Sequence, residues 1–367
     1  MKPKRLVIKV GTSLLTNQNK RLDRRCVRRI VSGVVRVREM GYQVVLVSSG
    51  AVGAGMGLLG LHHRPRALDK LQAAAALGQG HLMRIYDELF HEAGLRTGQI
   101  LLTQEGVQDR RRYLNARNTL LALLDYGAVP IVNENDSVST EEIRFGDNDV
   151  LSALVANLAE ASLLVILSDV DGLYTSQGRD RSLISRVEHI TPEIEAVAGG
   201  TRKSSAVGGM TTKILAAKVA TSSGIPCIIA NGRRSSTVLQ NILEGKEVGT
   251  YFVASERGIM GKKRWVAYAS KVAGRIRVDA GAQKALAEGD KSLLPSGISG
   301  VEGNFKLGDV VSVLGPCGEE FARGLSNYSA EEMAQIKGLK SGQLEGVLGR
   351  VAYAEAIHRD NLVILSK

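Results

Sequence analysis

Residues 5–13 read Arg5-Leu6-Val7-Ile8-Lys9-Val10-Gly11-Thr12-Ser13, and they give the first indication of the fold. Its apolar run has the length of one β-strand and is rich in Val, Ile and Leu, as are strands that a sheet buries on both faces. The run ends at a glycine that is followed by two hydroxyl side chains. Open parallel sheets bind ligands at the carboxyl ends of their strands, so this turn is a candidate ligand site.

The same kind of apolar run recurs through the first 260 residues and alternates with amphipathic helical segments. Such alternation is typical of βαβ units, so we expect an open, mainly parallel α/β sheet sandwiched between helices. Further strands are predicted at 43–48, 98–103, 128–133, 163–168 and 226–230. Helices are predicted at 23–40, 67–93, 114–126, 150–161, 211–223 and 236–244, and a polar hairpin at 138–145.

The segment 23–40 shows the helical period clearly, and Gly41 follows it as a C-terminal stop. Its arginines fall on the face opposite the apolar stripe, and a charged helix face of this kind is usually solvated. The buried stripe is predicted to consist of Cys26, Ile30, Val31, Val34 and Val35.

The alternation of strands and helices stops in a charged stretch near residues 254–270. The residues that follow are rich in Gly and Val, with one helix predicted near 280–288 and more helix within 330–337. This composition indicates a separate, compact and β-rich domain. We therefore divide the chain into a first domain at 1–260, a linker at 261–274, a second domain at 275–352 and a C-terminal tail at 353–367.

The composition of the 367 residues narrows the class of protein. Aromatic residues supply only 4%, so surfaces that stack on bases are scarce, and the net charge of +11 is spread along the chain. The three cysteines are odd in number and far apart, which excludes a disulfide framework or zinc pattern and favours a reducing cytoplasm. Neither a targeting segment nor a run of about 18 apolar residues is present, so we expect no membrane span.

Two lysines stand where a cation is unfavourable. Lys9 lies inside the first apolar strand, and a buried ammonium group needs an anion nearby. Lys213 lies in the first turn of a predicted helix, where a positive charge opposes the helix dipole unless a phosphate binds at the same helix terminus. The alternative for Lys9 is a side chain that reaches solvent past the sheet edge, and for Lys213 a solvated side chain.

A third candidate is the polar segment 145–153, which contains Asp147, Asn148 and Asp149. Its carboxylates and amide could orient the two lysines or hold a magnesium ion. The alternative is a turn before a helix, with Asn148 or Asp149 as the N-cap.

Two nucleotide-binding motifs do not apply. Gly55, Gly57 and Gly60 match the spacing of the dinucleotide fingerprint, but no helix is predicted to open there at once and no acidic residue ends the next strand. A Walker sequence is absent, which excludes a P-loop NTPase.

Taken together, these segments resemble the amino acid kinase family along nearly the whole chain. Residues 275–352, with Leu293-Leu294-Pro295 and Gly303-x-Phe305, resemble a PUA domain. The segments that carry the kinase resemblance are 7–13, 47–52, 115–117, 133–136, 145–153 and 208–213.

The resemblance implies that the chain transfers the γ-phosphoryl group of ATP to the side-chain carboxylate of L-glutamate, which is the first step of proline biosynthesis. The residue inventory agrees, because an ionised carboxylate is already a nucleophile and needs no general base. Phosphoryl transfer instead needs positioning and charge neutralisation. Magnesium is expected mainly with the nucleotide, and no separate metal ligands are assigned.

Carried over by position, the resemblance gives Lys9 and Lys213 the role of neutralising charge on the transferred phosphoryl group, and Asp149 the role of holding both lysines. The residues implied for glutamate are Ser49, Asp136 and Asn148, with Asp136 receiving the ammonium group. The residues implied for the nucleotide are Lys9, Ser168, Asp169, Val207, Gly208, Gly209, Met210, Thr211, Thr212 and Lys213.

This sequence departs from the family at two places. Ala206-Val207 stands where Gly-Thr is frequent, so a loop hydroxyl is missing, and Ser168 stands where Thr is common. The resemblance further implies feedback inhibition by proline, a homodimer or homotetramer, and a working association with glutamyl phosphate reductase.

Two alternatives stay open at this point. One is an RNA-binding or RNA-modifying protein that uses the PUA-like domain, although the low aromatic content argues against nucleic acid as a partner. The other is a sister kinase that acts on aspartate, acetylglutamate or a nucleoside monophosphate.

Overall fold

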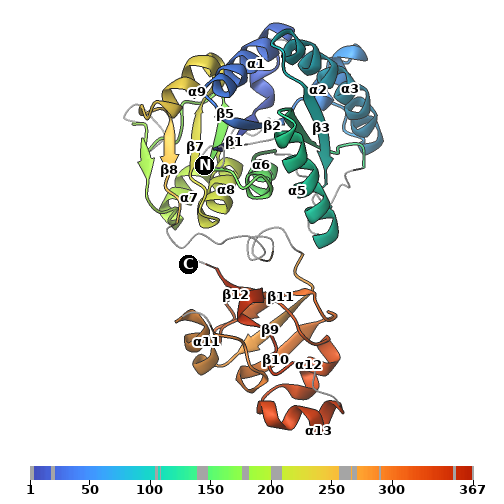
Figure 1. The fold of residues 1–367 in the computed structure, drawn as a ribbon, viewed down its shortest axis with the longest axis vertical. Helices are drawn as coiled ribbons and strands as arrows, with labels where there is room; N and C mark the ends of the chain where they lie inside the picture. The colour runs from blue at the N-terminus through green and yellow to red at the C-terminus, as the bar shows by residue number, and fades with distance from the viewer. Residues whose placement is uncertain are drawn as a thin grey trace. The chain divides into compact units, whose positions relative to one another are not determined.

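The fold was obtained as a computed structural model of the chain (Figure 1). Contacts within it divide the chain into two compact units, each described by itself: Met1–Gly106 with Arg111–Gly258, and Val107–Arg110 with Ile259–Lys367. The structure describes residues 4–17, 21–103, 106–107, 109–138, 148–175, 182–199, 209–255, 266, 271–288, 291–349 and 353–365.

The first unit is built on an eight-stranded sheet with the order β3-β4-β2-β1-β5-β7-β8-β6. All neighbouring strands are parallel except β7 and β8. The expectation of an open, mainly parallel sheet is therefore confirmed. The bounds of the strands are β1 Arg5–Val10, β2 Gln43–Ser48, β3 Thr97–Leu102, β4 Val129–Glu134, β5 Leu163–Ser168, β6 Arg186–Val187, β7 Cys227–Asn231 and β8 Thr250–Phe252.

Helices cover both faces of this sheet, with α1, α3 and α9 on one side and α6, α7 and α8 on the other (Figure 1). The six predicted helices are confirmed, and α5 begins earlier than predicted. The bounds are α1 Arg24–Glu39, α2 Ala51–Leu58, α3 Leu68–Glu92, α5 Arg110–Asp125, α6 Asn148–Leu158, α7 Pro192–Gly199, α8 Met210–Ser222 and α9 Ser235–Leu243. No helix in the described part of the chain is long and apolar enough to cross a membrane.

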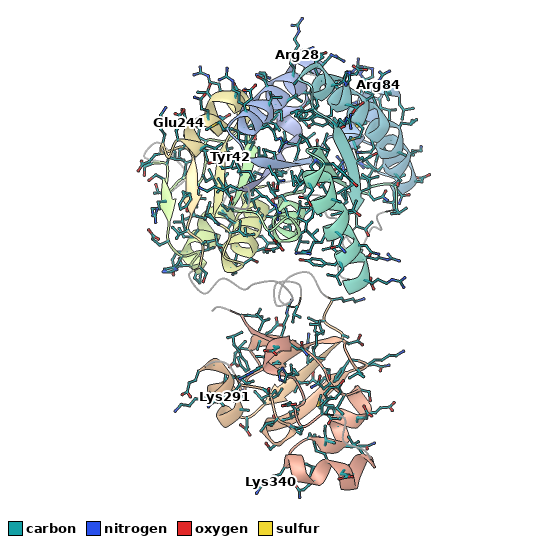
Figure 2. The ribbon with its side chains drawn as sticks, in the orientation of Figure 1. Arg28, Tyr42, Arg84, Glu244, Lys291 and Lys340 are labelled. Carbon is teal, nitrogen blue, oxygen red and sulfur yellow. The ribbon has the colours of Figure 1, made fainter. Side chains whose placement is uncertain are left out.

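Helix α1 begins at its N-cap, Asp23, whose side chain accepts from the backbone N–H of Arg25 at 2.7 Å. The predicted stripe is only partly correct, because Cys26 and Val35 are half-buried. Figure 2 shows Arg28 pointing away from the sheet, and its guanidinium binds Glu92 of α3 at 2.6 Å. The residues of α1 that are buried are Val27, Ile30, Val31, Gly33, Val34 and Val37.

Helix α2 was not predicted, and its packing against α3 requires a glycine at position 55. A Cβ atom on Gly55 would lie 1.7 Å from the carbonyl oxygen of Ala74 in α3, and one on Gly78 would lie 1.9 Å from that of Ala51. Only glycine permits such an approach of two helix backbones. The glycines at 55 and 78 therefore serve helix packing.

The second unit contains a five-stranded sheet with the order β10-β9-β11-β12-β13. Both predicted helices are present, and β13 pairs with β12, so the small sheet includes residues beyond the predicted range 275–352. The bounds are β9 Gly274–Val278, α11 Ala280–Ala287, β10 Ile298–Gly303, β11 Val310–Leu314, β12 Glu320–Leu325, α12 Ala330–Ile336, α13 Leu344–Leu348 and β13 Leu362–Ile364.

Candidate active site

Three side chains from separate elements meet at the end of the central strands. Lys9 comes from β1, Asp149 from the first turn of α6 and Lys213 from the first turn of α8. The ammonium group of Lys213 lies 3.1 Å from Oδ2 of Asp149, and that of Lys9 pairs with Oδ1 of the same carboxylate. Lys213 is 5% exposed, Lys9 is 3% exposed and Asp149 is 0% exposed. Both interpretations that left the lysines in solvent are therefore wrong.

The start of α8 adds polar groups beside this cluster. Thr212 Oγ1 lies 3.0 Å from Oδ2 of Asp149 and 2.8 Å from the carbonyl oxygen of Gly209. Gly209 is the N-cap of α8 and supplies no side chain to its first turn. The backbone N–H groups of a helix N-terminus carry partial positive charge and bind anions readily.

Positive charge therefore converges at one place, from two ammonium groups and a helix N-terminus. Charge of this density in a site of low exposure is suited to a phosphate-bearing ligand. Because Asp149 binds both lysines, it fixes where their charges stand relative to each other. The arrangement can neutralise a phosphoryl group during its transfer.

The predicted glutamate-binding residues Ser49 and Asn148 lie together. Nδ2 of Asn148 is 3.0 Å from the hydroxyl of Ser49 and 2.9 Å from the carbonyl oxygen of Ser48. The same Nδ2 also donates to Oδ1 of Asn133 at 2.9 Å. Oδ1 of Asn148 is buried and accepts no hydrogen bond from the described residues. An acceptor of this kind is suited to a donor group on a ligand.

Asp136 lies in the turn after β4 and is half-buried. Burial raises the pKa of its carboxyl above the usual value, while the charge of Arg64 acts in the opposite direction. Burial disfavours the ionised carboxylate unless a cation binds to it. Asp136 is therefore suited to receive an ammonium group.

The predicted nucleotide residues are described only in part. Ser168 ends β5, the neighbour of β1 in the sheet, and its hydroxyl donates to Asp169 at 3.2 Å. Val207 and Gly208 lie outside the described residues, as do 139–145 of the predicted hairpin and Asp147. Gly209, Met210, Thr211, Thr212 and Lys213 are described and form the start of α8.

Sequence patterns missed two residues beside this site. Asn133 is 1% exposed, and its Nδ2 donates to Oε1 of Gln79 in α3 at 2.7 Å. Asn133 lies near the end of β4 and opens the segment 133–136, which carries part of the kinase resemblance, so its position was a usable signal. Gln79 lies in the middle of a long helix and carries no local signal of a role.

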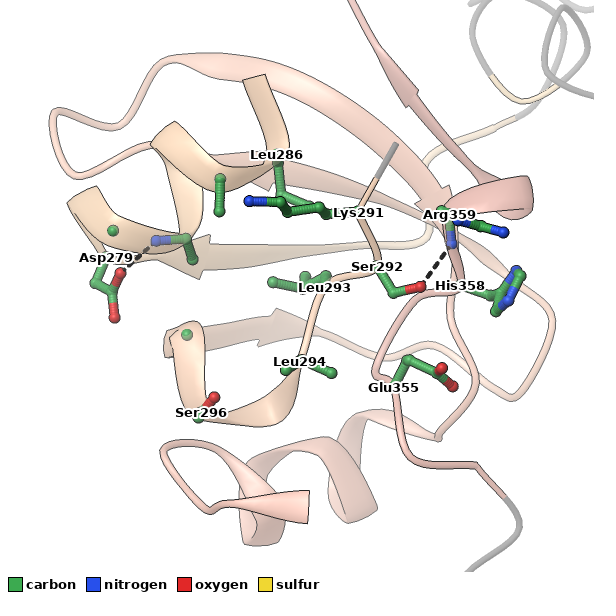
Figure 3. Close-up of a pocket in the computed structure, with 14 residues that line it drawn as sticks. Asp279, Leu286, Lys291, Ser292, Leu293, Leu294, Ser296, Glu355, His358 and Arg359 are labelled. Carbon is green, nitrogen blue, oxygen red and sulfur yellow. Dashed lines mark hydrogen bonds between the residues drawn. The ribbon is translucent and has the colours of Figure 1, made fainter. Parts of the chain in front are cut away.

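A pocket of about 650 Å³ lies within the second unit (Figure 3). Leu286, Leu293 and Leu294 contribute apolar surface, and Lys291 and Glu355 bring opposite charges to its lining. Both signs of charge are present, so the lining does not select one class of ligand.

The profiles of two protein families match this chain. The sequence profile of the amino acid kinase family matches residues 4–231, and that of the PUA domain matches 274–348. The chain therefore belongs to the amino acid kinase family.

Relatives make the likeness more particular. The chain is 51% identical to Glutamate 5-kinase of Moorella thermoacetica, over 99% of this chain and 96% of that protein. It is 49% identical to Glutamate 5-kinase of Paraburkholderia phymatum, over 99% and 98% of the two chains. Among solved structures, carbamate kinase from Giardia lamblia bound to AMP-PNP shares the fold, with a TM-score of 0.51 and 19% identity over 69% of this chain and 99% of that one.

Proposed function

We propose that this chain is an ATP-dependent kinase that phosphorylates the side-chain carboxylate of L-glutamate to L-glutamyl 5-phosphate, the first step of proline biosynthesis. Glutamate 5-kinases that match it over nearly their whole length support this activity. The observation that carries it is the convergence of Lys9 and Lys213 on the carboxylate of Asp149. Neither an RNA-directed activity nor another acceptor is favoured by these relatives.

The chemistry needs little from the protein besides placement and charge. An oxygen of the glutamate side chain forms a bond to the γ-phosphorus, the bond from phosphorus to the β–γ bridging oxygen breaks, and ADP leaves with that electron pair. Lys9 and Lys213 neutralise charge on the transferred group, and Asp149 holds both ammonium groups where they act.

The nucleotide lies against the start of α8 and the end of β5. Gly209 through Thr212 offer backbone N–H groups to the phosphates. The family resemblance assigns Val207 and Gly208 to the nucleotide as well. Ser168 and Asp169, at the end of the strand beside β1, contact the rest of the nucleotide.

The acceptor lies against Ser49, Asp136 and Asn148. Asp136 receives the α-ammonium group, and this pairing relieves the cost of keeping a half-buried carboxylate ionised. Asn148 offers its buried Oδ1 as a hydrogen-bond acceptor.

Magnesium, when bound, neutralises charge on the nucleotide phosphates. Asp149 is not suited to bind a resident magnesium ion, because ammonium groups bind both of its carboxylate oxygens. Magnesium would therefore arrive on the nucleotide, and no step is assigned to it.

Proline, which also carries an ammonium group and a carboxylate, would inhibit at or near the glutamate site. We further propose a cytoplasmic homodimer or homotetramer. It would work with glutamyl phosphate reductase, because an acyl phosphate is labile and must be consumed quickly.

Trapping of the product with hydroxylamine tests the proposed function. The chain is incubated with ATP, Mg²⁺ and one of four acceptors: glutamate, aspartate, acetylglutamate or a nucleoside monophosphate. We expect a hydroxamate with glutamate and much less with the other two carboxylates, and ADP release that depends on glutamate. Faster turnover of another acceptor would overturn the proposal.

A further inference from the structure

We infer that Gln79 of α3 is a positioning residue that acts on the amino-acid acceptor through Asn133 and Asn148. It holds the amide of Asn133, and Asn133 holds the amide of Asn148 so that the oxygen of Asn148 faces the ammonium group of the acceptor. This inference rests on the proposed function and extends it to a residue of the helix behind the site.

The orientation of Asn133 is fixed by a backbone donor. Oδ1 of Asn133 accepts from the backbone N–H of Glu134 at 2.9 Å, and a backbone N–H can only donate. The other end of the amide, Nδ2, must therefore be the end that meets Gln79, at 2.7 Å from its Oε1. Asn133 is 1% exposed, so its N–H groups depend on partners within the protein.

A backbone acceptor fixes the orientation of Asn148 in the same way. Its Nδ2 lies 2.9 Å from the carbonyl oxygen of Ser48, which can only accept. Nδ2 of Asn148 also donates to Oδ1 of Asn133. The hydrogen bonds therefore run in one direction, from Asn148 to Asn133 and from Asn133 to Gln79. Oδ1 of Asn148 is left facing away from them, buried and without a donor among the described residues.

The chemistry of glutamate names the missing donor. At neutral pH both carboxyl groups of free glutamate are ionised and can only accept, so its α-ammonium group is its only donor. Oδ1 of Asn148 would accept from that group. Binding of glutamate would thus supply a hydrogen-bond donor to the buried Oδ1 of Asn148. A phosphoryl acceptor without an amino group could not supply that donor.

Close packing of two helices brings Gln79 to this place. Its neighbour Gly78 lies against the carbonyl oxygen of Ala51, at a distance that no side chain would permit. Ala51 begins α2, directly after Ser49 and Gly50. The contact that seats α3 beside the turn at Ser49 and Gly50 therefore also sets the distance from Gln79 to Asn133.

Replacing Gln79 with leucine tests the inference. Gln79→Leu removes the acceptor for Asn133, whereas Gln79→Glu keeps a carbonyl-type oxygen there. Gln240→Leu, in α9, is the matched control: Gln240 is also half-buried and accepts a side-chain hydrogen bond, from Arg36. Steady-state kinetics are measured with glutamate, with glutarate, which lacks the amino group, and with ATP.

We expect Gln79→Leu to raise the KM for glutamate about fivefold, the scale of one hydrogen bond, with kcat and the KM for ATP within about twofold of the parent. The preference in kcat/KM for glutamate over glutarate should fall by a similar factor. Gln79→Glu and Gln240→Leu should keep that preference. If Gln79 had only a structural role, the substitution would lower kcat/KM by the same factor for glutamate and for glutarate.

An unchanged preference for glutamate in a folded Gln79→Leu enzyme would overturn the inference. If that variant does not fold, Gln79→Ala replaces it, with the same expected loss of preference and the same contrary outcome. A parent enzyme that forms no hydroxamate from glutamate would overturn the proposed function and the inference together. An active parent with an unaltered variant would overturn the inference alone.

Discussion

Lys9 and Lys213 are far apart in the sequence, yet their ammonium groups bind the two oxygens of one carboxylate, that of Asp149. The pairing makes the position of each lysine depend on the other. A strand and a helix terminus that meet at one carboxylate form a rigid mount, which is what a transferred phosphoryl group requires. Two surface lysines with the same total charge would not hold that geometry.

Removal of Lys213 should therefore affect turnover far more than binding. We expect Lys213→Ala to lower kcat at saturating substrates by roughly 10²- to 10³-fold, as for removal of one preorganised electrostatic group. Lys218→Ala is the control, because Lys218 lies on the same helix and pairs at the surface with Glu195. Turnover of Lys213→Ala within tenfold of the parent would contradict the role assigned to it, and the same limit applies to Lys9→Ala.

Neutralisation of Asp149 should destabilise the fold and strengthen its response to nucleotide. Asp149→Asn leaves two buried ammonium groups without the carboxylate they share, at a cost of about 3–5 kcal/mol. Thermal unfolding should show a lower Tm, and MgATP should raise that Tm by more than it raises the Tm of the parent. Glu195→Gln, which breaks an exposed pair, should cost about 0–1 kcal/mol. Equal nucleotide shifts in Asp149→Asn and the parent would contradict this account.

The central strands could be predicted from sequence because burial on both faces leaves a continuous apolar run, as in β1 and β5. The short strands β6 and β8 could not, since two or three residues show no period. Helix α2 was missed for a different reason. Its glycines have poor helix propensity, and its packing against α3 supplies the stability that propensity lacks.

The residues of the site likewise differ in whether the local sequence reveals them. Lys9 and Lys213 could be found because a cation in an apolar strand or in the first turn of a helix is locally unfavourable. Gln79 could not, because a glutamine within a helix is ordinary and only the fold brings it to Asn133.

The raised pKa of Asp136 predicts how glutamate binding depends on pH. Burial favours the protonated carboxyl in the folded protein, so the charge that attracts the ammonium group is present above this pKa and is lost as pH falls through it. The KM for glutamate should rise toward acid pH, from a higher pH than the ordinary value for aspartate implies. Asp136→Asn should have a higher KM that lacks this rise, and the difference between the two profiles removes the titration of glutamate itself. Parallel profiles would show that Asp136 does not receive the ammonium group.

The glycine contact between α2 and α3 gives a prediction with its control on the same helix. Gly78→Ala would place a methyl group 1.9 Å from the carbonyl oxygen of Ala51, so the helices must separate, at a cost of about 1–3 kcal/mol or more. Gly80→Ala meets open space and should stabilise α3 by about 0.5–1 kcal/mol, because alanine is the better helix former.

Denaturant unfolding measures both changes, and kinetics add a second readout for Gly78→Ala. Separation of the helices draws Gln79 away from Asn133, so the KM for glutamate should rise while the KM for ATP stays near that of the parent. If Gly78→Ala were as stable as Gly80→Ala, the close approach of the two helices would not be what seats α3 beside the turn at Ser49 and Gly50.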